Sequence, residues 1–239
     1  MEVHHHPDLH HRRKHFREYF LEFLMIFLAV TMGFLAESLR EHFGDKEKER
    51  EYVSSLVQNL KDDTAMFHAI IQANKEKMDT LGLLAGLRHK DLNDSASRRL
   101  LYKYARKIGY YSMFRGNDAT LLQLKNSGGL RYIRRDHAAD SIANYAVQIT
   151  YVYSAEQMYI QGTQAAIDAA EEVIEFNLPR DGGLDAWPVF TKDPHQWHVF
   201  FNKVYTEQGW TGNYVRNMED RLPLAERLLV FLQKEYDLD

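Results

Sequence analysis

The chain has 239 residues, which is enough for one domain with a sizeable core in addition to a short N-terminal segment. Apolar residues make up 45% of the sequence, and this share excludes general disorder. The sequence contains no cysteine, so disulfides, thiolate metal sites and cysteine nucleophiles are all excluded. The net charge is −4, but it is unevenly distributed: residues 88–135 carry twelve basic and three acidic residues, whereas residues 136–239 carry seven basic and seventeen acidic residues.

Residues 1–17 form a tail that is rich in histidine and arginine. Two histidine pairs, His6–His10 and His11–His15, have the i,i+4 spacing that could chelate a metal on a helix. Pro7, however, disfavours a helix at the start of this segment. We therefore expect a tail without a metal site, whose histidines are partly charged near an acidic membrane surface.

Residues 18–39 predict a transmembrane helix. Between Tyr19 and Ala36 the only charged residue is Glu22, and about 20 apolar residues are needed to cross roughly 30 Å of hydrocarbon. A cleaved signal peptide is the alternative. The sequence does not favour it, because no small-residue cleavage site is followed by an ordinary mature start, and the helical pattern continues through Glu37 and Arg40. We expect an uncleaved single-pass anchor surrounded by membrane lipid.

The orientation of this anchor depends on the basic residues at its two ends. Four basic residues precede the helix and four follow it, so their number alone does not decide the orientation. Those before the helix lie closer to the membrane. We therefore expect a cytoplasmic N-terminus in a bacterial inner membrane, with residues 40–239 on the opposite side.

The two faces of the predicted membrane helix differ in the size of their side chains. At 100° per residue, one stripe holds Glu22, Ile26, Ala29, Gly33, Ala36 and Arg40, and bulky side chains lie opposite. Small residues let helices approach closely in lipid, and a carboxylate on this stripe would be costly against acyl chains. The stripe therefore predicts a homo-oligomer interface. Two alternatives remain: Glu22 lies at the headgroup boundary and the small residues occur by chance, or Glu22 belongs to a proton or ion path.

Residues 40–239 predict one helical domain, so that the whole chain is all-α. Charges of both signs fill residues 45–51, and an apolar ladder with spacings of three and four follows over residues 53–84. Asp193-Pro194 is a typical helix start, in which a capping residue is followed by proline in the first turn. The connections between arms are short, which favours an antiparallel bundle of about four helices. The expected arms are 45–87, 97–127, 136–177 and 194–236.

Several residues predict where helices begin and end. Asn117 or Asp118 can cap a short helix that the Gly-Gly pair at 128–129 closes. Within the fourth arm, Gly209 and Gly212 are expected to weaken or break the helix.

The second arm carries a block of basic residues that predicts a surface for an anionic partner: Arg98, Arg99, Lys103, Arg106 and Lys107. Tyrosines interleave with these residues, so nucleic acid is one interpretation. An anionic headgroup or a small anion is another. We favour pairing with the acidic arms, within or between subunits, and expect no nucleic-acid partner.

Two stretches carry a resemblance to a known family. One runs from His4-His5-His6-Pro7 through Glu22–Val30 and Gly33–Glu37, and the other is Leu124-Lys125-Asn126-Ser127-Gly128-Gly129-Leu130. In these residues the chain resembles an uncharacterised family of bacterial single-pass membrane proteins. The resemblance covers about a third of the chain. It implies an anchor with a following domain, and it implies no activity.

The sequence shows no pattern typical of catalysis. It contains no phosphate-binding glycine loop, no His-Glu-x-x-His and no nucleophile elbow. His195 and His198 beside Asp193 could ligate a metal, but such polar residues are common at a helix start. We therefore expect a non-enzymatic protein without cofactor or metal.

Two functions are consistent with this sequence. The first is a homo-oligomer formed through the membrane helix, acting as a scaffold or channel-like assembly. The second is a membrane-anchored helical ligand-binding or sensor domain that acts through a separate membrane partner protein.

Overall fold

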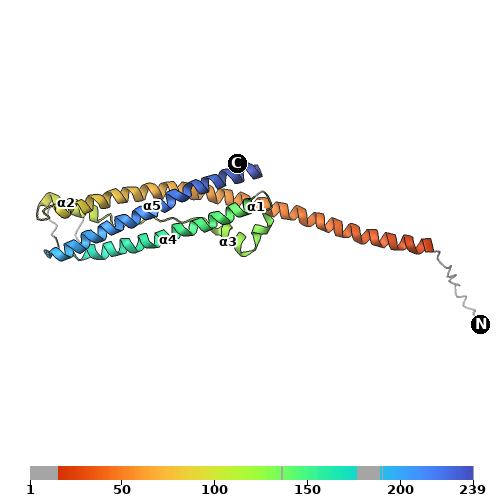
Figure 1. The fold of residues 1–239 in the computed structure, drawn as a ribbon, viewed down its shortest axis with the longest axis horizontal. Helices are drawn as coiled ribbons and strands as arrows, with labels where there is room; N and C mark the ends of the chain where they lie inside the picture. The colour runs from red at the N-terminus through yellow and green to blue at the C-terminus, as the bar shows by residue number, and fades with distance from the viewer. Residues whose placement is uncertain (1–15, 136, 177–188, 190, 239) are drawn as a thin grey trace, which may run out of the picture. The chain divides into compact units, whose positions relative to one another are not determined.

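The computed structural model describes residues 16–135, 137–176, 189 and 191–238 (Figure 1). Its helices are α1 (Phe16–Gly86), α2 (Ser95–Ala105), α3 (Ala119–Asn126), α4 (Ala138–Glu171) and α5 (Pro194–Tyr236), with short 3₁₀ turns η1 (Leu87–His89) and η2 (Gly129–Tyr132). Within these residues there is no strand, only an isolated antiparallel bridge between Ile174 and Val189. The all-α prediction is therefore confirmed for the described part of the chain. The histidines at positions 4–15, and with them the metal alternative for the tail, lie outside it.

The chain divides into two compact units, Met1–Glu49 and Arg50–Asp239, and α1 contributes to both. In the first unit, α1 contains a stretch that is long and apolar enough to cross a membrane, and none of that stretch is buried within the protein. The helix is continuous through Gly44, so no break separates the apolar residues from the amphipathic ones that follow.

The second unit has a core built from the amphipathic stripes that the sequence predicts. The ladder of α1 is buried from Val53 to Leu84, and the stripe of α4 is buried from Ile142 to Ala170. Most of these side chains belong to one apolar cluster with residues of α5 such as Met218 and Leu232. A second cluster around Leu101 joins α2 to the ends of the long helices. Burial of this apolar surface is the main driving force for the fold.

Hydrogen bonds and ion pairs show the direction of the long helices. Between α4 and α5 they join residues whose numbers run in opposite order, as in Glu156–Tyr214 and Thr163–Glu207, so these helices are antiparallel. Residues 50–86 of α1 are likewise antiparallel to α5, and they are parallel to α4. The contacts that establish this are Lys75–Glu219 and Met78–Gln208 with α5, and Asp63–Tyr145 and Lys77–Thr163 with α4.

The predicted second arm, 97–127, contains two helices, and the short helix expected after Asn117 or Asp118 is present as α3. The arm consists of α2, an extended segment 110–118 without regular secondary structure, and α3. The extended segment runs antiparallel to α1, because Ser112 contacts Asn74 while Asn117 contacts Asp63. Glycine, aromatic and turn-forming residues dominate this stretch, and they have low helix propensity. The break between the two helices was expected, but the extended course of residues 110–118 along α1 was not predicted from the sequence.

Helix ends and breaks follow the predictions in part. The Asp193 side chain accepts a hydrogen bond from His195 N at 2.9 Å, with Pro194 in the first turn, as predicted. Asp118 occupies the cap position of α3, but its carboxylate accepts from the Tyr153 hydroxyl and makes no capping bond. The expected break at Gly209 and Gly212 is wrong, since α5 is one helix from Pro194 to Tyr236. Side-chain packing outweighs the modest helix penalty of glycine there.

Glycines in these helices allow a matched test of packing. A Cβ on Gly209 would meet nothing within 4 Å, whereas one on Gly162 would lie 2.8 Å from Trp210 Cδ1. We expect Gly209→Ala to raise the free energy of unfolding by about 0.5–1 kcal/mol. Gly162→Ala should lower it by about 1–3 kcal/mol through overpacking. Urea unfolding followed by circular dichroism in detergent measures both, and similar effects of the two variants would contradict the packing described here.

Candidate functional site

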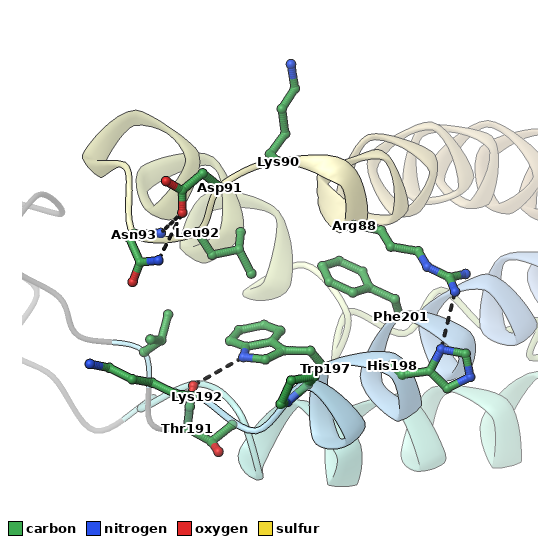
Figure 2. Close-up of a pocket in the computed structure, with 12 residues that line it drawn as sticks. Arg88, Lys90, Asp91, Leu92, Asn93, Thr191, Lys192, Trp197, His198 and Phe201 are labelled. Carbon is green, nitrogen blue, oxygen red and sulfur yellow. Dashed lines mark hydrogen bonds between the residues drawn. The ribbon is translucent and has the colours of Figure 1, made fainter.

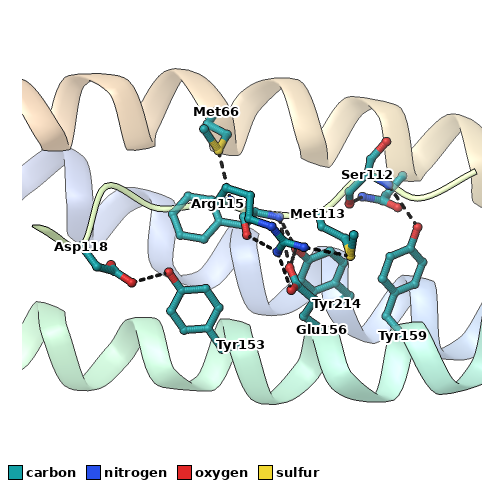
Figure 3. A network of polar contacts seen from close by, with 11 residues as sticks. Met66, Ser112, Met113, Arg115, Asp118, Tyr153, Glu156, Tyr159 and Tyr214 are labelled. Carbon is teal, nitrogen blue, oxygen red and sulfur yellow. Dashed lines mark hydrogen bonds and ion pairs between the residues drawn. The ribbon is translucent and has the colours of Figure 1, made fainter.

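The densest polar network in the second unit lies under the extended segment 110–118 (Figure 3). A backbone that is neither helix nor sheet must find other partners for its N–H and C=O groups. Phe114 N donates to Tyr214 Oη at 2.8 Å and to Glu156 Oε2 at 3.1 Å. The Tyr214 hydroxyl in turn donates to Glu156 Oε2 at 2.7 Å. Side chains of α4 and α5 thus replace the ladder that a neighbouring strand would provide.

The charge of Glu156 is balanced by an arginine on the extended segment itself. Arg115 Nη1 lies 2.9 Å from Glu156 Oε1, and the two side chains are 62% and 5% exposed. The guanidinium therefore reaches from solvent to a buried carboxylate. This arrangement satisfies both carboxylate oxygens without placing the arginine in the core.

Residues of α1 and α4 hold the rest of the extended segment. Asp63 accepts from Asn117 N at 2.9 Å and from the Tyr145 hydroxyl at 3.2 Å. Burial raises the pKa of Asp63, and these two donors oppose that rise. The Tyr159 hydroxyl accepts from Ser112 N at 3.4 Å, and burial raises the pKa of this phenol to about 12. It therefore stays protonated as a donor at physiological pH.

A buried ion pair joins α1 to α5. Lys77 Nζ lies 2.7 Å from Glu207 Oε1, and their side chains are 6% and 0% exposed. Thr163 of α4 donates to the same oxygen at 3.0 Å, so three helices meet here. Burial raises the pKa of Glu207 and lowers that of Lys77, while their mutual attraction opposes both shifts. Glu207 Oε2 has no hydrogen-bond partner among the described residues.

These polar residues were not identified from the sequence, although a signal for them exists. Each occupies a position on an apolar stripe three or four residues from a buried hydrophobic neighbour. Glu156 lies between Val152 and Tyr159, and Glu207 lies between Val204 and Thr211. A charged residue within an amphipathic stripe indicates a buried partner, because an unpaired charge in the core is strongly unfavourable.

The predicted membrane-helix stripe makes few contacts in the described chain. Ile26 is 66% exposed, and Ala29, Gly33 and Ala36 are also exposed. Glu22 is half-buried, and Arg40 forms an exposed ion pair with Glu37. A Cβ on Gly33 would meet nothing within 4 Å. The stripe therefore presents an open helix surface.

The five predicted basic residues of the second arm separate into two groups. Arg99, Lys103 and Lys107 are exposed, whereas Arg98 and Arg106 are half-buried. The ammonium groups of Lys103 and Lys107 lie over the rings of neighbouring tyrosines, at 5.7 Å and 4.5 Å from the ring centroids. Part of the predicted basic surface is thus used in local cation–π contacts.

A pocket of about 490 Å³ lies between residues 88–93 and 189–201 (Figure 2). It includes His198, for which the sequence left metal binding as an alternative. His198 Nδ1 lies 3.2 Å from Arg88 Nη2, and its Nε2 lies 3.0 Å from Asn202 Nδ2. The described residues contain no group of three or more His, Asp or Glu arranged to hold a metal ion.

A second, mostly apolar pocket of about 360 Å³ lies beside the Leu124–Leu130 stretch, between α3 and α4. The backbone conformation and the packing of that stretch explain why positions 128 and 129 are glycine. Gly128 has φ 66°, which favours glycine. A Cβ on Gly129 would lie 3.2 Å from Leu124 Cα. The turn therefore ends α3 as predicted and forms one wall of the pocket.

No family model matches this sequence, and no curated protein or solved structure is significantly similar to it. Function must therefore be inferred from the residues and contacts described above.

The buried ion pair gives a sharp stability prediction. Lys77→Met leaves the Glu207 carboxylate buried without its cation, so the free energy of unfolding should fall by about 3–5 kcal/mol at neutral pH. The pKa of Glu207, already raised, rises further in this variant. A carboxyl whose pKa is raised in the folded state makes the protein less stable as pH rises. The loss of unfolding free energy in Lys77→Met, relative to the wild type, should therefore be larger at pH 8 than at pH 5.

Lys75→Met is the matched control for this measurement. Lys75 pairs with Glu219, but these side chains are 50% and 40% exposed. Its removal should cost less than about 1 kcal/mol. Urea unfolding of both variants at the two pH values measures the difference, and equal losses would show that burial of the Lys77 pair is unimportant.

The network under the extended segment predicts a second effect on stability. Tyr214→Phe removes an acceptor for Phe114 N and a donor to Glu156, and we expect a loss of about 1–3 kcal/mol. Tyr205→Phe is the control, because Tyr205 is 71% exposed and should change stability by less than about 0.5 kcal/mol. Thermal unfolding compares the two variants, and a neutral Tyr214→Phe would mean that these bonds do not hold the segment.

Proposed function

We propose that the chain is a non-enzymatic single-pass membrane protein that forms a homo-oligomer through its membrane helix, as a scaffold or channel-like assembly. The observation that carries this proposal is the exposed apolar stretch of α1. Met25, Ile26 and Phe27 are successive residues that are each more than half exposed, and at 100° per residue they lie on different sides of the helix. A helix that is apolar on all sides belongs in a core or in a membrane, and none of this apolar stretch is buried.

The topology proposed here follows the predicted boundaries. Residues 18–39 cross a bacterial inner membrane with the N-terminus in the cytoplasm, and residues 40–239 form an antiparallel bundle of about four arms on the other side. The exposed Glu37–Arg40 pair supports this boundary, because it marks where charge begins after the apolar stretch. The resemblance to bacterial single-pass membrane proteins supports the same arrangement.

Self-association is proposed for the stripe that contains Ala29, Gly33 and Ala36. In lipid, helices gain little from hiding apolar surface from one another, so association depends on close packing of small residues and on polar contacts. The open space at Gly33 leaves room for a neighbouring helix. Glu22 on the same stripe would then face a neighbour or water, which is the less costly environment for a carboxylate.

The buried acidic side chains hold the structure together, and this supports the proposal of a non-enzymatic protein. Glu156 and Asp63 hold backbone N–H groups of the extended segment, and Glu207 is paired with Lys77. Perturbed pKa values often mark active sites, but structural ion pairs and networks perturb them as well. In this chain burial raises the pKa values of Asp63 and Glu207, and the contacts give both acids a structural role.

A second candidate function is a membrane-anchored ligand-binding or sensor domain that acts through a separate partner protein. The pockets of about 490 and 360 Å³ in the second unit favour it, since ligand sites commonly have such volumes. A thermal-shift screen of the full chain with several ligand classes tests this candidate, because a ligand that binds only the folded state raises the melting temperature. No stabilisation by any class would count against it.

The oligomer proposal predicts which face of α1 tolerates substitution. Replacing Ala29 and Gly33 together by isoleucine should weaken association at least tenfold, or about 1.4 kcal/mol, because bulky side chains keep the helices apart. Replacing Leu28 and Leu35 together by isoleucine, on the opposite face, should change it little. Light scattering of the detergent-solubilised protein over a dilution series measures this. Monomeric wild-type protein, or equal effects of both double variants, would rule the interface out.

A further inference from the structure

We propose that the pocket between residues 88–93 and 189–201 binds a small, planar organic anion such as an aromatic carboxylate. This inference rests on the second candidate function and names its ligand class. The pocket is built by two stretches that are far apart in the sequence, the turn after α1 and the start of α5 (Figure 2). Hydrophobic side chains form its interior, and most of the charged side chains stand at its rim.

The apolar part of the pocket is a slot between Leu92 and the ring of Trp197, with Phe201 beside them (Figure 2). The Trp197 indole is fixed in orientation, since its Nε1 donates to Thr191 O at 3.1 Å. Its ring lies 6.0 Å from that of Phe201, which is 4% exposed. A rigid aromatic surface of this kind favours a flat ligand, because ring stacking adds to the burial of apolar area.

The charges around the slot favour an anion. Three lining residues are basic (Arg88, Lys90 and Lys192), and one is acidic, so the lining has a formal charge of +2 when His198 is neutral. The single acid, Asp91, forms local hydrogen bonds: its Oδ1 accepts from the backbone N and the side-chain amide of Asn93 at 2.9 and 3.0 Å. Its carboxylate thus fixes the local turn.

In Figure 2 the Arg88 guanidinium lies on the His198 side of the Phe201 ring, and Arg88 is the lining cation that we expect to contact an anionic group at that edge of the slot. Its Nη2 is held by His198 Nδ1 at 3.2 Å, and the guanidinium has further N–H groups that can form a two-point contact with a carboxylate. In Figure 2 the Lys90 side chain extends away from the slot, so it contributes only through the longer-range field. Lys192 is exposed at the rim and is expected to contribute modestly.

The size of the pocket limits the ligand to a small molecule. A volume of about 490 Å³ lies within the range of small-molecule sites and is too small to seat a folded partner. The expected ligand therefore has one flat apolar part, one anionic group at the edge of that part and no second charge. Indole-3-acetate has these features, and indole-3-acetamide is its neutral counterpart of the same shape.

The test is a calorimetric titration of the full chain in zwitterionic detergent with these two probes. The amide also corrects for partition of the ring into micelles. We expect the carboxylate to bind at least tenfold more tightly than the amide, and Arg88→Gln to reduce this preference to about one, because the guanidinium supplies the contact. Lys192→Gln should reduce it about two- to threefold. Lys234→Gln, which removes an exposed charge from the last turn of α5, should leave it unchanged.

Three results would overturn the proposal: equal affinity for the carboxylate and the amide, a preference that survives in Arg88→Gln, or no binding of either probe up to about 10 mM. Circular dichroism of each variant confirms that it is folded, which is expected because Arg88 is exposed. Stabilisation by a different ligand class in the thermal-shift screen would keep the second candidate function while this ligand assignment fails.

Discussion

The second unit depends on the hydrogen bonds that hold a non-helical backbone against three long helices. Most backbone groups of a helical protein are satisfied within the helices themselves, but residues 111–117 lie outside the helices. An unsatisfied buried N–H costs about 1–3 kcal/mol, so a backbone group of the extended segment that is shielded from water needs a side-chain partner. Glu156 and Tyr214 meet this requirement at Phe114, where the segment lies deepest.

This requirement explains why the core contains so many polar groups. A core made only of leucine and isoleucine would pack the helices more simply, and buried ion pairs are weak evidence for stability. Here Asp63 and Asn74 on α1 bind the extended segment, while Lys77 on the same helix binds Glu207 of α5. Because a shift of one residue along any helix would leave several of these groups unpaired, the polar contacts also fix how the helices align.

The fold could be predicted from the sequence where local patterns decide it, and not where distant residues do. The stripe from Val53 to Leu84 is amphipathic by itself, and Asp193-Pro194 caps α5 through neighbours in sequence. The two helices of the arm 97–127 were expected, but the path of the extended segment between them was missed because local sequence does not specify it. Its true partners, such as Tyr214, lie about a hundred residues away. The candidate pocket was missed for the same reason: Arg88 is unremarkable until α5 brings His198 and Trp197 beside it. Only the basic block and the membrane stripe were identified as surfaces, since each lies within one short stretch of sequence.

A single helix, α1, contributes to two units whose side chains require different surroundings. Residues 19–36 are apolar except for Glu22 and are mostly exposed, whereas those after Arg50 alternate between a buried stripe and a solvated face. Helix formation itself does not distinguish these parts, because both satisfy the backbone internally. The side chains alone specify the surroundings, and only lipid or other helices satisfy the first pattern. Since the second part carries Asp63, Asn74 and Lys77, the helix that we propose as the anchor also organises the core on which the pocket is built.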